Sequence, residues 1–179
     1  MDSKAQASSV FQLLISAIVA GAVLMILLQV LGVINFGFNQ APDTAAADQL
    51  KDAWNHRATI KTTTSNVTFT SAASNINSVA LADSSKVGIS KEQICLSLGD
   101  FSTIDNPPFE INDDRTSITY TGSSNKDARV SVYCYTGKEL QSTLEGLGTG
   151  LDPAWAGECA CADSEETCCL VALRFEKRG

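Results

Sequence analysis

The chain has 179 residues, and 20 Asp and Glu outnumber 13 Lys and Arg, giving a formal net charge of −7. The sequence contains no cluster of basic residues and no basic face rich in aromatic residues, so it argues against nucleic acid as the principal partner. Beyond an apolar N-terminal stretch, the chain is long enough for one domain with a real core.

The apolar stretch opens almost at the N-terminus. No charged residue lies between Lys4 and Asp43, and the centre of this stretch is Val10–Ile34. As a helix this segment would reach roughly 37 Å, more than the roughly 30 Å of a bilayer core. A secretory signal peptide has a shorter apolar core of about 7–15 residues, so an uncleaved anchor fits better. Only a helix satisfies its own backbone in lipid, and Lys4 as the basic flank favours a cytoplasmic N-terminus.

Small residues within this stretch recur four apart. Ser16 pairs with Ala20, and Ala17 pairs with Gly21. Such spacing lets apolar helices approach closely where lipid provides no hydrophobic drive. These four positions are therefore a candidate helix-packing surface; the alternative is a single-span anchor in which they occur by chance.

The leader ahead of the apolar stretch reads Lys4-Ala5-Gln6-Ala7-Ser8-Ser9-Val10-Phe11. It resembles the class III signal peptide of archaeal type IV pilins, and the resemblance extends to about Asn35. It implies that a membrane-embedded prepilin peptidase cuts between Ala5 and Gln6 and that the apolar segment stays on the product. Many relatives carry at the Val10 position a glutamate that pairs with a neighbouring subunit's N-terminal amine. Without it, the alignment of neighbouring subunits would fall to helix packing or to Gln6 or Gln12.

After Ile34, Gly37 and Pro42 predict a kink or break. Asp43 and Thr44 are the expected caps of a second helical stretch, from about Ala45 to His56. Its apolar positions form one narrow face: Ala46, Leu50 and Trp54.

The rest of the chain predicts a β-rich head, because β-branched and alternating segments are separated by Gly- and Asn/Asp-rich turns. The candidate strands are Thr59–Thr70, Asn77–Ala82, Gln93–Leu98, Phe109–Ile111, Ser117–Thr121, Arg129–Tyr135 and Cys168–Phe175. One short helix, from about Lys138 to Gly146, is expected among them.

Six cysteines lie in the last half of the chain: Cys95, Cys134, Cys159, Cys161, Cys168 and Cys169. An even count in a domain outside the cell predicts up to three disulfides, and six cysteines allow fifteen pairings. Cys168 and Cys169 would point to opposite faces of a strand, so they should bond to different partners. We expect long-range bonds from the 159–169 segment to Cys95 and Cys134. The alternative is a zinc site of four thiolates, although the spacing differs from that of a zinc ribbon.

Other candidate sites are few. Asn66-Val-Thr68 is an N-glycosylation sequon, and in an extracellular head it predicts a glycan. Asn112, Asp113 and Asp114 gather oxygen ligands suited to calcium, but without the loop of an EF-hand. His56 is the one histidine, and no nucleophile elbow, phosphate loop or His-Glu-x-x-His motif is present. We therefore expect neither enzymatic activity nor a cofactor.

The predicted fold is α+β: a long N-terminal hydrophobic helix of the pilin type, followed by an antiparallel β-rich globular head with disulfides. The predicted parts are a leader at 1–5, a long helix at 6–56 and an extracellular head at 57–179.

The pilin resemblance implies a structural subunit of an adhesive, type IV pilus-like filament on the cell surface. The filament would be a helical homopolymer, extracted from a membrane precursor by a platform protein and an assembly ATPase. One alternative is a minor pilin or pseudopilin of a secretion or DNA-uptake machine. Another is a single-span surface protein whose head binds a ligand, and a redox or metal enzyme built on the cysteines comes last.

Overall fold

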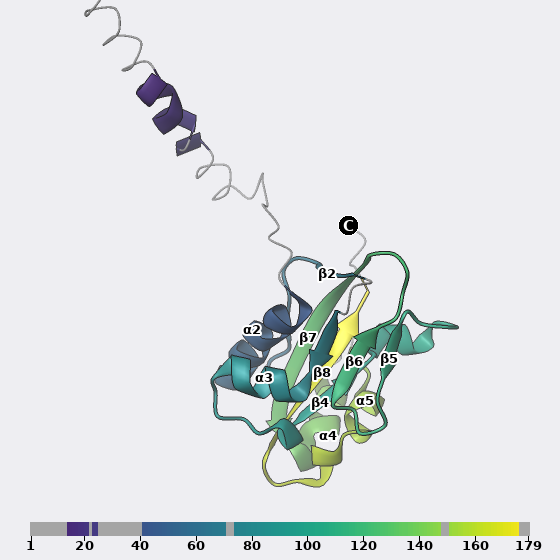
Figure 1. Cartoon of the computed structure of the whole chain (residues 1–179). Coiled ribbons are helices and arrows are strands. Elements are labelled where there is room, and N and C mark those ends of the chain that lie inside the picture. Colours follow the sequence, from purple (N-terminus) through teal and green to yellow (C-terminus); the bar gives the residue numbers. More distant parts are fainter. Residues whose placement is uncertain (1–13, 22, 25–40, 71–73, 148–150, 176–179) are drawn as a thin grey trace, which may run out of the picture. The chain divides into compact units, whose positions relative to one another are not determined.

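The structure is a computed structural model that describes residues 14–21, 23–24, 41–70, 74–147 and 151–175 (Figure 1). The chain divides into two compact units, Met1–Phe38 and Asn39–Gly179. Within the first unit, residues 14–21 and 23–24 are helical.

The predicted long N-terminal hydrophobic helix is wrong for this structure. Among the described residues, no helix has both the length and the apolar character needed to cross a membrane. The helix predicted for 6–56 is also interrupted at Ala41, which has φ −53° and ψ 138°. Proline disfavours helical geometry in the residue before it. Ala41 is therefore not helical, and α2 (Pro42–Asn55) begins as a separate helix. Pro42 takes the first helical turn, where its missing N–H costs nothing.

The second unit is built on a five-stranded sheet around two long strands. β7 (Lys126–Thr136) pairs antiparallel with β8 (Thr167–Arg174), and β8 pairs parallel with β4 (Ile94–Ser97) on its other side. The short strands β1 (Lys61–Thr62) and β2 (Val67–Phe69) both pair antiparallel with β7. The head is therefore mixed, not wholly antiparallel as predicted. A parallel pair needs a long crossover, and here the chain between β4 and β8 supplies it.

A second, three-stranded antiparallel sheet has the order β3-β6-β5. Its strands are β3 (Asn75–Asn77), β6 (Ser117–Tyr120) and β5 (Phe109–Ile111). Phe109 of β5 packs edge-on against Phe69 of β2, with ring centroids 4.9 Å apart. Aromatic contacts therefore join the small sheet to the large one.

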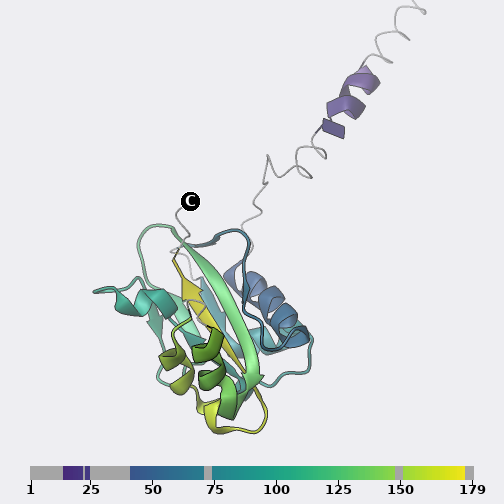
Figure 2. The same ribbon diagram turned by 180° about the vertical axis from the view of Figure 1, so that it is seen from behind.

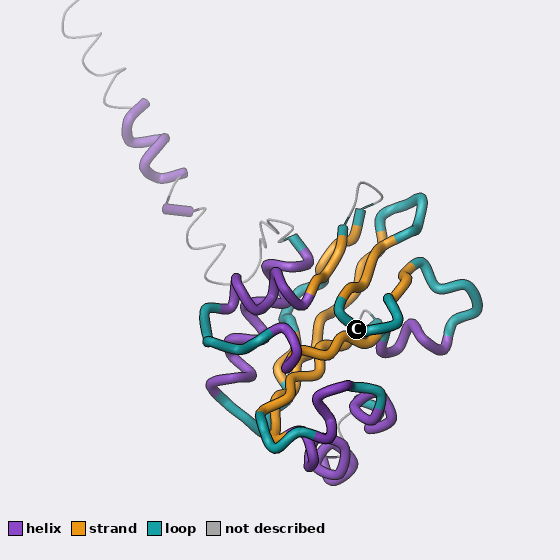
Figure 3. Tube along the Cα trace, turned by 60° about the horizontal axis from the view of Figure 1, so that its bottom comes forward, coloured by secondary structure: helices purple, strands orange, loops and turns teal. Residues whose placement is uncertain are grey.

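Helices cover both faces of the large sheet (Figures 2 and 3). One face packs against α2 and α3 (Ser78–Ser85), and the other packs against α4 (Gly137–Leu147) and α5 (Pro153–Gly157). The described connections include the 3₁₀ turns η1 (Lys91–Gln93), η2 (Gly99–Thr103) and η3 (Ala160–Asp163).

Side chains of β7 pack in the hydrophobic clusters on both faces of the sheet. Val130, Val132 and Cys134 belong to the cluster on the α2 side. Tyr133 lies in the cluster on the α4 side. The intervening Ser131 is also fully buried, and its hydroxyl is 2.8 Å from that of Thr62. A strand buried on both faces explains why its polar and apolar residues alternate only weakly.

Most predicted elements lie close to observed ones. The Thr59–Thr70 segment splits into β1 and β2, and the helix expected at Lys138–Gly146 is α4. The strand expected at Asn77–Ala82 is wrong, because α3 begins there. Asp43 and Thr44 do not cap α2, whose N-cap is Ala41 without a side-chain hydrogen bond.

Candidate functional site

The four predicted helix-packing residues, Ser16, Ala17, Ala20 and Gly21, lie on the helical residues 14–21 and are exposed. A Cβ added at Gly21 would meet nothing within 4 Å. Large apolar side chains accompany them, each between 46 and 64 % exposed: Leu14, Ile15, Ile18, Val19, Val23 and Leu24. The predicted processing site, Ala5 and Gln6, lies outside the described residues, as do Val10 and Gly37.

All six cysteines form disulfides. Cys95 bonds to Cys159 and Cys134 bonds to Cys169, with sequence separations of 64 and 35. These are the long-range bonds expected to Cys95 and Cys134. The third bond is local and joins Cys161 to Cys168, seven residues apart. The thiolates that a zinc site would need are therefore absent from this state of the chain.

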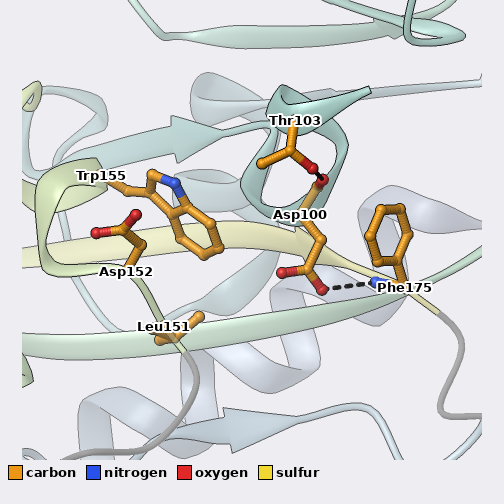
Figure 4. A pocket seen from close by; sticks show the side chains of 6 residues that line it. All are labelled: Asp100, Thr103, Leu151, Asp152, Trp155 and Phe175. Atoms are coloured by element: carbon orange, nitrogen blue, oxygen red, sulfur yellow. Dashed lines mark hydrogen bonds between the residues drawn. The ribbon is translucent and has the colours of Figure 1, made fainter. Parts of the chain in front are cut away.

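A surface pocket of about 350 Å³ lies where η2, α5 and the end of β8 meet (Figure 4). We call it the Trp155 pocket. It is lined by Asp100, Thr103, Leu151, Asp152, Trp155 and Phe175. Trp155 is half-buried, and Phe175 is 44 % exposed. In Figure 4 the Asp100 side chain lies between the two aromatic rings, and Asp152 lies beside Trp155.

Each carboxylate of the Trp155 pocket uses one oxygen to hold the local backbone. Asp100 Oδ2 accepts hydrogen bonds from Arg174 Nε and from the Phe175 amide, both at 2.9 Å. Asp152 Oδ1 caps α5 by accepting from the Ala154 amide at 2.9 Å. Asp100 Oδ1 and Asp152 Oδ2 make no hydrogen bond within the described parts of the chain.

The walls of this pocket depend on β4. Cys95 of β4 bonds to Cys159, two residues after the end of α5. At its C-terminal end β4 runs into η2 through Gly99, which has φ +57°. A Cβ on Gly99 would overlap the carbonyl oxygen of Leu173 in β8. Glycine therefore lets η2 lie directly on β8, close to the point where β8 ends at the pocket.

A second pocket, of about 280 Å³, lies beside the Cys95–Cys159 bond. Its charged lining residues are Lys91, Glu92, Asp114 and Arg115. The Arg115 guanidinium forms an ion pair with Glu158. Counting Glu158, three carboxylates face two cations, but none of the described residues that line this pocket is aromatic.

Asn112, from the predicted calcium-binding cluster, uses its side chain for hydrogen bonds within its own turn. Asn112 Oδ1 accepts from the Thr116 and Ser117 amides, both at 2.8 Å. Over the described ranges no group of three or more His, Cys, Asp or Glu could hold a metal ion. Asn66 is half-buried just before β2, and the hydroxyl of Thr68 in the same sequon donates to Asp127 at 2.6 Å.

His56 ends α2 in a small surface network. Its Nδ1 is 2.9 Å from Asp52 Oδ1, and Lys61 Nζ is 3.0 Å from Asp52 Oδ2. The hydrogen bond from Lys61, opposed in part by desolvation, holds the pKa of Asp52 below its usual value. His56 Nδ1 also lies 3.0 Å from the Asp52 backbone carbonyl oxygen, so the network closes the end of α2.

Comparison with known proteins gives no relative: no family model, no curated protein and no solved structure matches this chain.

Proposed function

We propose that this chain is the structural subunit of an extracellular, type IV pilus-like filament with an adhesive role. The observation that carries the proposal is the leader Lys4–Phe11, followed at once by a stretch without charge up to Asp43. In archaeal type IV pilins a leader of this kind is cut in front of the apolar segment, which then remains on the subunit. Here the cut would fall between Ala5 and Gln6.

The exposed apolar residues at 14–21 and 23–24 support self-association. A helix that is apolar around its circumference needs a partner or lipid to cover it. Neighbouring copies in a filament would provide that cover, and the small residues Ala17 and Gly21 would let the helices approach closely. No charge in the stretch would be buried by such packing.

The three disulfides support an extracellular head. Disulfides persist in oxidising compartments and are rare where thiols are kept reduced. The 39–179 unit carries all three bonds and both hydrophobic clusters. It would form the filament surface and make the adhesive contacts.

The decisive experiment is intact mass and N-terminal sequencing of protein sheared from the cell surface, without reductant. A chain that starts at Gln6 and is found in filaments is the expected result. A chain that keeps Met1 and stays in membranes would overturn the proposal and favour a surface protein that binds through its head. A low copy number in the sheared fraction would point instead to a minor pilin.

Packing through the small residues is tested separately. Gly21→Leu should reduce the yield of filaments while leaving precursor levels unchanged, because the added side chain separates neighbouring helices. Val19→Leu is the matched control, since that position already carries a large apolar side chain. Normal filaments from Gly21→Leu would contradict the packing role.

A further inference from the structure

The Trp155 pocket combines two aromatic rings with two carboxylates. Trp155 and Phe175 contribute partly exposed rings, and Asp100 and Asp152 each keep one oxygen free of hydrogen bonds to the described residues. An aromatic face carries negative quadrupole charge and attracts cations, Trp most strongly. The rings and the carboxylates therefore both favour a positively charged ligand.

The charge of the pocket is negative in balance. Arg174 neutralises Asp100 through a hydrogen-bonded ion pair at 2.9 Å. Asp152 has no ion-pair partner among the described residues and is exposed at the start of α5. Within the described ranges, one carboxylate thus remains uncompensated beside the indole ring, which disfavours an anionic ligand.

The type of cation follows from the lining. A hard metal ion needs several converging oxygen ligands, whereas this pocket is lined by only two carboxylates, which come from separate elements. An organic cation can instead place methyl or methylene groups against Trp155 and its charge towards Asp152 (Figure 4).

We propose that the Trp155 pocket binds an organic ammonium group. The site is distinct from the apolar segment invoked for filament assembly and does not depend on it. Asp152 supplies the unbalanced charge, Trp155 the aromatic face, and Asp100 with Phe175 the opposite wall.

The test uses the full chain in a non-ionic detergent. The sequence has two tryptophans, so Trp54→Phe leaves Trp155 as the sole indole reporter. Choline should change its fluorescence saturably, at constant ionic strength. The uncharged isostere 3,3-dimethylbutan-1-ol should not, because it keeps the shape and loses the charge. Equal responses to the two compounds would overturn the proposal and leave an ordinary apolar pocket.

A matched pair of variants locates the charge. Asp152→Asn keeps an N-cap oxygen for α5 but removes the negative charge, and should weaken choline binding about tenfold. Asp163→Asn removes an exposed carboxylate on η3 outside the pocket, and should leave affinity unchanged. Titration calorimetry measures both, with circular dichroism to verify folding. Unchanged affinity in Asp152→Asn would overturn the proposal.

A second ligand identifies the source of the ammonium group. Nα-acetyl-lysine amide presents the primary ammonium of a protein side chain, whereas choline presents a weakly hydrated quaternary one. Tighter binding of the lysine derivative would support a polypeptide partner, and tighter binding of choline would support a small molecule or headgroup. Binding of neither would overturn the proposal.

Discussion

Cys168 and Cys169 are adjacent in β8, yet they belong to hydrophobic clusters on opposite faces of the sheet. Cys169 bonds to Cys134, its register partner in β7. Cys168 bonds to Cys161 in the segment that leads into β8. One dipeptide therefore anchors β8 both to the neighbouring strand and to the layer that contains α4 and α5.

The three bonds should contribute unequally to stability, because a cross-link restricts the unfolded chain more when it closes a longer loop. Replacing both cysteines of the Cys161–Cys168 bond by Ala, with a separation of seven residues, should lower the free energy of unfolding by about 2 kcal/mol. The same change at Cys95 and Cys159, separated by 64 residues, should cost about 4 kcal/mol. Denaturant titration of the two double variants measures the difference. A larger loss from the local bond would contradict this order.

The sequence predicts only part of the disulfide pairing. Strand geometry alone places Cys168 and Cys169 on opposite faces. Strand geometry does not predict the partner of Cys159. That partner is Cys95 in β4, and β4 becomes the parallel neighbour of β8 although residues 98–166 separate the two strands in sequence. Periodicity carries no information on which strands become neighbours. For the same reason the sequence does not predict the Trp155 pocket: Asp100 follows β4 and Phe175 follows β8, and these two strands become neighbours only in the fold.

Gly99 should be intolerant of a side chain. Gly99→Ala would force a Cβ into the Leu173 carbonyl at a residue with φ +57°, and should cost at least about 3 kcal/mol of unfolding free energy. Gly88 is the matched control, since it also has positive φ, +74°, but open space around its Cα. Gly88→Ala should cost only about 1 kcal/mol. Thermal denaturation compares the two, and equal losses would show that the close approach to β8 is unimportant.

Asn77 ends β3 and starts α3. Its Oδ1 accepts from the Val79 amide at 2.8 Å and the Ala80 amide at 3.4 Å. Asn77–Ala82 is among the predicted strands, although Asn before a run of Ala and Leu is also a helix N-cap signal. Asn77→Ala should cost about 1 kcal/mol by denaturant titration, and Asn77→Asp should cost little, because Asp also caps. Equal effects would exclude capping as the cause.

Acid should weaken the network at the end of α2. Since Lys61 and His56 lower the pKa of Asp52 in the folded chain, the carboxylate contributes stability above its unfolded pKa of about 3.9. That contribution is lost as pH falls through the lower folded pKa. The Asp52 side chain is about half exposed, so the effect should stay below about 1 kcal/mol and shrink with salt. Asp52→Asn should flatten the stability profile below pH of about 4; an unchanged acid slope would contradict this role.

Tyr133 carries a buried hydroxyl that has no hydrogen-bond partner among the described residues. Burial raises the pKa of the Tyr133 phenol, and the Thr143 hydroxyl offsets part of that rise. The Thr143 hydroxyl itself donates to the Glu139 carbonyl, at 2.6 Å. An unpaired buried hydroxyl destabilises the fold, so Tyr133→Phe should leave the free energy of unfolding unchanged or raise it by about 1 kcal/mol. Tyr120→Phe is the control, because that hydroxyl donates to the Ser124 carbonyl, and its loss should cost about 1 kcal/mol.

Alkaline titration provides an independent readout at Tyr133. Burial, with a smaller contribution from Tyr135, raises the pKa of its phenol. The neutral form is favoured in the folded chain, so this stability is present below the unfolded pKa of about 10 and is lost as pH rises through the folded pKa. Tyr133→Phe cannot ionise and should retain more stability than the wild type at high pH. A parallel alkaline decline in both proteins would mean that the Tyr133 hydroxyl is hydrated in solution.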